Sequence, residues 1–210
     1  MDVYRTDEEQ VEALRKWWLE NGKSIIAGIV IGLSAIYGWR AWQDHLQTRA
    51  EAASSEYQQM LAAVRQGETD SASKYAKSIL DDYHSTSYAR FAELLLARIA
   101  VDDKDYASAE GHLRQVMAKA SNDQIRHIAR LRLARLLTAQ DKFKEAEALL
   151  NISDKGKFLA DYEELRGDIF IRQGMTEAAQ NAYKQALANS NASEQDRSIL
   201  QMKMDELGGK

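Results

Sequence analysis

An uninterrupted apolar run near the amino terminus limits what this chain can fold into more than any other feature. From Ser24 to Trp39 the sequence reads SIIAGIVIGLSAIYGW, without a charged side chain. As a helix this run is about 24 Å long, and the hydrocarbon core of a bilayer is about 30 Å thick. Lys23 and Arg40 flank the run, and their aliphatic stems extend its apolar length while their charges reach the headgroups. The run therefore predicts a transmembrane helix over residues 23–42.

The tryptophans support this interpretation, because all four lie at the edges of the run. Trp17 and Trp18 precede it, and Trp39 and Trp42 close it, as expected at two membrane–water interfaces. A cleaved signal peptide would begin with a short basic region and end at small residues, whereas here a longer segment of mixed charge comes first. A buried core helix of this length would carry a polar stripe. A membrane anchor fits better than either alternative.

Two glycines inside the predicted span are candidates for a helix contact. Gly28 and Gly32 form a Gly-x-x-x-Gly pair, and small residues at this spacing let a second membrane helix approach closely. Glycine is also frequent in membrane helices in general, which explains the pair equally well. Gly28 and Gly32 are the predicted membrane-helix contact, with composition as the alternative.

Basic residues predict the orientation of the span. The segment 1–23 carries four Lys or Arg, and the equivalent window after the apolar run carries two, which favours a cytoplasmic amino terminus. Residues 1–22 are therefore the predicted cytoplasmic tail. Thr6 to Glu9 fits a capping box, so we expect an amphipathic helix against the inner leaflet that ends at Asn21–Gly22. Its apolar side chains are Val11, Leu14 and Trp18.

Composition excludes several kinds of site. The chain has no cysteine and no proline, so disulfides, thiolate metal sites and thiol nucleophiles are absent, and helices are favoured. A formal net charge of −4 argues against nucleic-acid binding. Residues 102–105 lack the glycine and the closing glutamate of a calcium loop. The histidines are His45, His84, His112 and His127. None of them has a second metal-ligating residue at H-x-x-x-H spacing. We expect no metal, no cofactor and no enzymatic activity.

Beyond the span, short polar breaks separate apolar-periodic stretches of helical length. No break follows Trp42 until Gln66, so the membrane helix is expected to continue into the next part of the chain. The later breaks fall at 67–70, 84–87, 102–105, 121–123, 140–142, 151–157, 173–176 and 189–193.

Internal repeats indicate how these helices are arranged. The unit from Leu165 to Leu187 resembles the tetratricopeptide repeat (TPR), in which one helix pair takes about 34 residues. Small residues at Gly167 and Ala179 let its two helices touch. The alanine equivalent to Ala179 recurs at positions 72, 109 and 146. The predicted fold is all-α, with a single N-terminal transmembrane helix followed by a TPR-like α-solenoid of about three to four helix pairs. The helix from Glu194 to Leu207 would seal its edge, with Ile199, Leu200, Met204 and Leu207 on the packed side.

The resemblance to TPR domains also implies a partner-binding groove, because the first helix of each pair lines the concave face in that family. The groove would have a basic, partly apolar middle and an acidic carboxyl-terminal end, suited to a charged segment. Alternatively, Arg98 and Arg135 pair with acids on a solvated face, where an ion pair is worth about 0–1 kcal/mol. The groove residues carried over are Phe91, Leu94, Arg98, Leu131, Arg135, Asp161, Glu164 and Asp168.

The whole chain is similar to the YfgM family, ancillary subunits of the bacterial Sec translocon. The similarity includes the opening segment, the repeats and the closing LQMKMDEL, and its most specific parts are Glu-Asn-Gly at 20–22 and Gly-Trp-Arg at 38–40. The resemblance implies a single-pass bacterial inner-membrane protein with a cytoplasmic amino terminus and a periplasmic TPR-like domain over residues 43–210. It implies the SecYEG translocon, the periplasmic chaperone PpiD and the lipid bilayer as partners. It also leaves room for a cytoplasmic regulator bound through the tail, and it supplies no catalytic residues.

Three non-enzymatic functions follow from this interpretation. The first is a membrane-anchored TPR-like adaptor that joins the translocon to periplasmic chaperones and assists the handling of newly exported proteins. The second is a periplasmic holdase chaperone that binds unfolded segments directly in the groove. The third is a general scaffold for envelope assembly. An apolar groove would favour the holdase, and a charged groove the adaptor.

Overall fold

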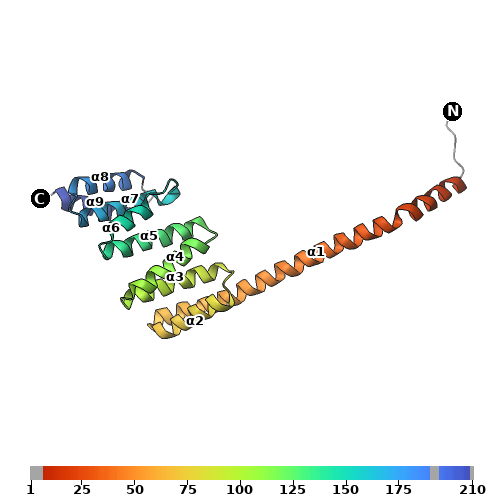
Figure 1. Cartoon of the computed structure of the whole chain (residues 1–210), viewed down its shortest axis with the longest axis horizontal. Helices are drawn as coiled ribbons and strands as arrows, with labels where there is room; N and C mark the ends of the chain where they lie inside the picture. The colour runs from red at the N-terminus through yellow and green to blue at the C-terminus, as the bar shows by residue number, and fades with distance from the viewer. Residues whose placement is uncertain (1–6, 190–193, 209–210) are drawn as a thin grey trace, which may run out of the picture. The chain divides into compact units, whose positions relative to one another are not determined.

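The computed structural model describes residues 7–189 and 194–208, and these form helices with no strand among them. The all-α prediction is thereby confirmed. The helices are α1 (Asp7–Gln66), α2 (Thr69–Asp82), α3 (Ser87–Asp102), α4 (Tyr106–Lys119), α5 (Asp123–Ala139), α6 (Phe143–Leu150), the 3-10 turn η1 (Gly156–Phe158), α7 (Leu159–Arg172), α8 (Thr176–Asn189) and α9 (Glu194–Gly208). Figure 1 shows α2 to α9 following one another in a stack of helix pairs.

Helix α1 is a single helix of 60 residues. It continues to Gln66, as the sequence predicts, but the expected end at Asn21–Gly22 is wrong. The amide of Asn21 donates to the carbonyl oxygen of Trp17 at 3.0 Å, so this side chain is accommodated within the helix. Gly22 is buried, and a Cβ atom there would lie only 3.1 Å from Cε2 of the Trp18 indole. Thr6, the expected cap, lies outside the described residues.

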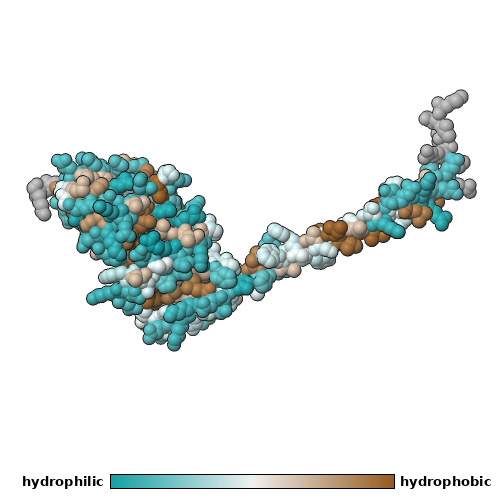
Figure 2. All heavy atoms as spheres, in the orientation of Figure 1, coloured by the Kyte–Doolittle hydropathy of each residue, from teal (hydrophilic) through white to brown (hydrophobic). Residues whose placement is uncertain are grey.

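The chain divides into two compact units, Met1–Ala52 and Ala53–Lys210. The first unit contains most of α1, including a segment long and apolar enough to cross a membrane, none of which is buried. Figure 2 shows this segment as a brown band of hydrophobic residues along α1. The single-span candidate is therefore present as one exposed apolar stretch of helix.

The second unit holds four helix pairs, and each pair has the same turn. One residue in each turn has a positive φ. In chain order these residues are Gly67, Lys104, Asp141 and Gly174. Five residues later comes a completely buried alanine, at 72, 109, 146 and 179. The left-handed residue reverses the chain, and the alanine lets the second helix approach the first. The repeat register predicted from the alanines is therefore the observed one.

The last helix, α9, packs on the final pair as predicted. Leu200 is buried with Ala179, Tyr183 and Ala186 of α8, and Met204 and Leu207 pack against the same cluster. Ile199 was expected on this side but is exposed. Because residues 199 and 200 are consecutive on a helix, their side chains are about 100° apart, and only Leu200 faces α8.

Candidate partner-binding groove

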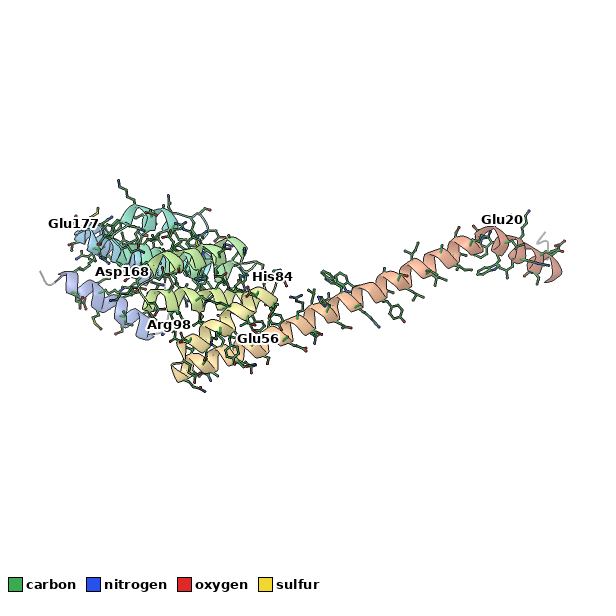
Figure 3. The ribbon with its side chains drawn as sticks, turned by 60° about the horizontal axis from the view of Figure 1, so that its bottom comes forward. Glu20, Glu56, His84, Arg98, Asp168 and Glu177 are labelled. Carbon is green, nitrogen blue, oxygen red and sulfur yellow. The ribbon has the colours of Figure 1, made fainter. Side chains whose placement is uncertain are left out.

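The predicted groove residues lie on the first helix of three successive pairs. Phe91, Leu94 and Arg98 come from α3, and Leu131 and Arg135 from α5. Asp161, Glu164 and Asp168 come from α7, and Figure 3 labels Arg98 and Asp168 on their helices. The structure gives these three sets different surroundings.

A hollow of about 410 Å³ lies between α3, α4 and α5 and includes Leu94, Arg98 and Arg135. This volume is within the range of ligand-binding pockets. Its arginines are Arg98, Arg132 and Arg135, and we call the hollow the arginine slot. Its apolar side chains include Leu94, Ala97, Val101, Tyr106, Leu113 and Leu136.

The positive charges of the arginine slot are poorly neutralised. Arg98 meets Asp102 one turn further on, with Nε and the carboxylate oxygen 3.8 Å apart and both side chains largely exposed. Within the described part of the chain, Arg132 and Arg135 have no carboxylate oxygen within 4.0 Å. Burial, and then the charges of Arg135 and Arg98, lower the pKa of the Arg132 guanidinium. The slot is a site of positive potential above an apolar floor.

Arg132 is a groove residue that the sequence interpretation missed. It occupies a repeat position outside those assigned to the concave face. The available signal was its spacing from Arg135, because residues three apart lie side by side on a helix.

Two predicted groove residues, Leu131 and Phe91, pack against other side chains of this chain and do not line the arginine slot. Leu131 is only 3% exposed and belongs to the central core, so its side chain is a core residue. Phe91 packs with Tyr57 and Tyr88, whose ring centroids lie 5.8 and 6.4 Å from its own. Phe91 retains an exposed edge, beyond the lining of the arginine slot.

The acidic end of the predicted groove is covered by α9. Nζ of Lys203 lies 2.7 Å from Glu164 and 2.8 Å from Asp168. Burial lowers the pKa of Lys203, but the hydrogen bonds to Asp168 and Glu164 outweigh burial and raise it. Asp161 is half-buried near the start of the same helix. The acidic positions 164 and 168 therefore already bind a cation from this chain.

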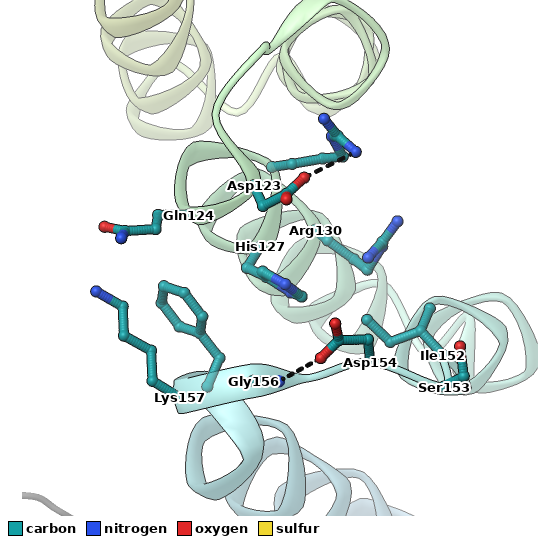
Figure 4. A pocket seen from close by; sticks show the side chains of 11 residues that line it. Asp123, Gln124, His127, Arg130, Ile152, Ser153, Asp154, Gly156 and Lys157 are labelled. Carbon is teal, nitrogen blue, oxygen red and sulfur yellow. Dashed lines mark hydrogen bonds and ion pairs between the residues drawn. The ribbon is translucent and has the colours of Figure 1, made fainter.

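A second cavity, of about 420 Å³, lies where the amino-terminal end of α5 meets the segment 152–158 (Figure 4). The imidazole of His127 stacks on Phe158 with ring centroids 5.0 Å apart. Its Nδ1 lies 2.9 Å from the hydroxyl oxygen of Tyr162. Burial, and then the charge of Arg130, lower the pKa of His127. His127 therefore joins α5 to α7.

Other polar groups of this cavity contact one another. Arg126 and Asp123 form an ion pair at 3.0 Å, and the amide N–H of Gly156 donates to Asp154 at 3.0 Å. Elsewhere His112 contacts Glu93 at 2.5 Å, a contact that ties α4 to α3. No cluster of three or more metal-ligating side chains occurs in the described ranges. We assign these histidines to contacts between helices.

The predicted membrane-helix contact, Gly28 and Gly32, has no other described part of this chain packed against it. A Cβ atom built at Gly28 or at Gly32 would have no neighbouring atom within 4 Å. Both positions are therefore free to receive a second helix, and larger residues fit there without strain inside this chain.

Known proteins resemble this chain along its whole length. Residues 15–209 match the family described as a tetratricopeptide repeat-like domain. The chain is 32% identical over 213 residues to the "Ancillary SecYEG translocon subunit" of Escherichia coli (strain K12), covering 99% of both chains. It is 34% identical over 207 residues to the protein of that name from Aggregatibacter actinomycetemcomitans, covering 98% of this chain and 100% of the relative. The relative from Haemophilus influenzae is 30% identical over 206 residues, covering 98% and 100%.

Proposed function

This chain belongs to the TPR-like family of ancillary SecYEG translocon subunits, and on that premise we propose that it is a non-enzymatic, membrane-anchored adaptor of the Sec translocon. In this role it assists the handling of newly exported proteins. Its partners are SecYEG, through the membrane segment, and a periplasmic chaperone such as PpiD, through the repeats.

The observation that carries this proposal is the continuity of α1. The helix that contains the exposed apolar stretch continues without a break to Gln66. Its last turns belong to the repeat domain, where Ala53, Met60 and Ala63 are buried. The membrane segment and the first repeat therefore share one helix with no loop between them. This continuity supports an adaptor whose repeats are joined to its membrane anchor without a separate linker.

The proposed topology follows from the basic residues near the span. Four Lys or Arg precede it and two follow it, which favours an amino terminus in the cytoplasm. The repeat domain then lies in the periplasm. Residues 1–22 form the cytoplasmic part, which is open to a regulatory partner. The span itself contacts the lipid bilayer.

A holdase is the second candidate, and the apolar floor of the arginine slot favours it. Exposed apolar surface in a hollow can receive a segment of an unfolded protein. The three arginines favour the adaptor, because a general holdase gains little from a fixed cluster of one charge. The mixed character of the slot fits a partner with a defined charge pattern better.

Affinity purification of the full chain from mild detergent, followed by mass spectrometry, tests the adaptor proposal. We expect SecY and one periplasmic chaperone to co-purify. Replacing Gly28→Ile and Gly32→Ile together should weaken the association with SecY by bulk alone, because isoleucine preserves insertion. Recovery of many unrelated exported proteins without SecY would favour the holdase and contradict the adaptor. Gly38→Ile is the matched control, since nothing lies within 4 Å of that glycine either.

A further inference from the structure

We propose that the arginine slot binds an extended acidic segment of a partner protein, in which one apolar side chain lies between two carboxylates on the same face. The inference rests on the proposed adaptor function, because it specifies the chemistry of the segment that the adaptor holds. It follows from the guanidiniums of the slot, from its apolar floor and from the helices that enclose it.

The arginines of the slot differ from several others in the repeat domain, which form close ion pairs. Arginines with a carboxylate oxygen within 3.0 Å are Arg114, Arg126, Arg166 and Arg172. In the slot, Arg98 lies 3.8 Å from the largely exposed carboxylate of Asp102. Among the described residues, Arg132 and Arg135 have no carboxylate oxygen within 4.0 Å. The slot therefore holds positive charge that carboxylates of another molecule can neutralise.

The acidic end of the predicted groove is already occupied, whereas the slot is open. Lys203 of α9 binds both Glu164 and Asp168. The slot is a hollow of about 410 Å³, and two of its three guanidiniums have no carboxylate of the described chain beside them. Of the two charged parts of the predicted groove, the slot is therefore the one available to a partner.

The apolar part of the slot can receive one side chain of such a segment. Leu94, Leu113 and Leu136 form a nearly buried floor, and the exposed side chains of Val101 and Tyr106 stand at its edge. An apolar side chain seated on this floor would be removed from water, which favours binding. Tyrosine and arginine are also the residue types that most often dominate binding at protein interfaces.

The helices around the slot favour an extended segment over a helical one. Helix α5 already packs beside α3 and α4 and supplies Arg132, Arg135 and Leu136 to the slot, so the place of a neighbouring helix is taken by this chain. A further helix with its side chains would need about 10–12 Å. In an extended chain, side chains two residues apart share one face and lie about 7 Å apart. The expected pattern is therefore an apolar residue with an acidic residue two positions before it and another two positions after it.

The apolar surface continues beyond the slot, as an elongated ligand requires. Phe91 precedes Arg98 by seven residues on α3, which places it two turns away on the same face, about 10.5 Å along the helix. Its ring packs on Tyr57 and Tyr88 and keeps an exposed edge. A chain that leaves the slot in this direction meets a second apolar contact. This arrangement fits a peptide better than a small anion.

Two heptapeptides of identical composition test the proposal. The probe is fluorescein-labelled Ser-Asp-Thr-Leu-Thr-Asp-Ser with an amidated carboxyl terminus. The control is Ser-Thr-Asp-Leu-Asp-Thr-Ser with the same label, which in an extended chain places both carboxylates on the face opposite the leucine. Each is titrated against the purified full chain in an uncharged mild detergent, and binding is followed by fluorescence anisotropy. We expect saturable binding of the probe with a Kd below about 1 mM, and at least about fivefold weaker binding of the control.

Variants of the slot locate the binding. Arg132→Gln and Arg135→Gln together should weaken binding of the probe at least about tenfold. Lys119→Gln and Lys184→Gln together remove two exposed lysines outside the slot. This pair makes the same change in net charge and should leave binding unchanged. All four side chains are exposed, so neither pair should lower the melting temperature. Equal binding of the two peptides, or full binding by the slot variant, would overturn the inference.

Two further outcomes also decide it. Displacement of the bound probe by phosphatidylglycerol vesicles, but not by phosphatidylcholine vesicles, would identify a lipid site and overturn the inference. The measurement uses no translocon, so it separates from the adaptor proposal. Probe binding without SecY co-purification would contradict only the adaptor, and the reverse pattern only the slot.

Discussion

The ring of Tyr183 on α8 lies directly against Gly167 on α7, so closely that a Cβ atom at position 167 would be 2.6 Å from Cδ1 of the ring. The hydroxyl of Tyr183 donates to Asp168 at 2.8 Å, and burial, then this hydrogen bond, raise the pKa of the phenol. The absent side chain at 167 thus sets the distance between the helices of the last pair. The same Asp168 carboxylate binds Lys203 of α9. The Tyr183–Asp168 hydrogen bond therefore also positions a carboxylate against which α9 packs.

Gly167→Ala should lower the free energy of unfolding of the repeat domain by about 1–3 kcal/mol, because the methyl group overlaps the Tyr183 ring and forces the helices apart. Gly111→Ala is the matched control. Gly111 also lies in a helix, but a Cβ atom there meets nothing within 4 Å, so alanine should stabilise by up to about 1 kcal/mol. Urea unfolding of both variants, followed by circular dichroism, measures the difference. Equal effects of the two substitutions would contradict the packing account.

Lys104→Gly should stabilise the second helix pair by about 0.5–1 kcal/mol, since Lys104 has a φ of 63° and an L-residue is strained there. Gly174→Ala, at the equivalent turn, should destabilise by about 1–2 kcal/mol. A Cβ atom at Gly174 has no neighbour within 4 Å, so the loss of stability caused by Gly174→Ala measures the backbone strain alone. Opposite shifts in melting temperature are expected, and shifts of the same sign would contradict the account.

The stability of the repeat domain should fall as the pH drops below about 6.5, in part because of His127. Its pKa is lower in the folded chain, so the unfolded chain binds more protons in this range. The contribution is fully present above the unfolded pKa and is lost as the pH falls from there through the folded pKa. His127→Gln should therefore flatten the dependence of the melting temperature on pH between about 7 and 5. His84→Gln removes an exposed imidazole and serves as a control. If it flattened the dependence of melting temperature on pH as much as His127→Gln does, the effect could not be assigned to His127.

Lys203→Glu in the full chain should release α9 from the last repeat, because a third carboxylate would face Glu164 and Asp168. Amide hydrogen exchange in residues 197–207 should then become faster, while exchange in α5 stays unchanged. Lys184→Glu changes an exposed lysine on α8 and provides the control. Unchanged protection of α9 would mean that Leu200 and its apolar neighbours hold the helix without the ion pairs.

The sequence predicted the helices and their register well, because the signals are local. Buried alanines such as Ala109 and Ala146 mark each close helix contact, and the left-handed turn five residues earlier follows from the same repeat. The predicted end at Asn21–Gly22 failed for a local reason too, since the ring of Trp18 covers Gly22 within the helix.

The groove was less predictable, because its character depends on contacts between distant residues. Lys203 is far from Asp168 in sequence, and its position in the acidic end follows only once α9 folds back. Leu131 occupies a position typical of a concave surface, yet neighbouring helices bury it. The predicted basic, partly apolar middle agrees with the residues that line the arginine slot, although its role in binding stays a prediction.

Attachment of alkaline phosphatase after Lys210 tests the central claim most directly, because that enzyme is active only outside the cytoplasm. If α1 crosses the inner membrane once with its amino terminus in the cytoplasm, the fusion should be active in intact cells, and the chain should remain uncleaved and membrane-bound. An inactive phosphatase, together with a fluorescent cytoplasmic reporter at the same position, would place the repeats in the cytoplasm and contradict the account.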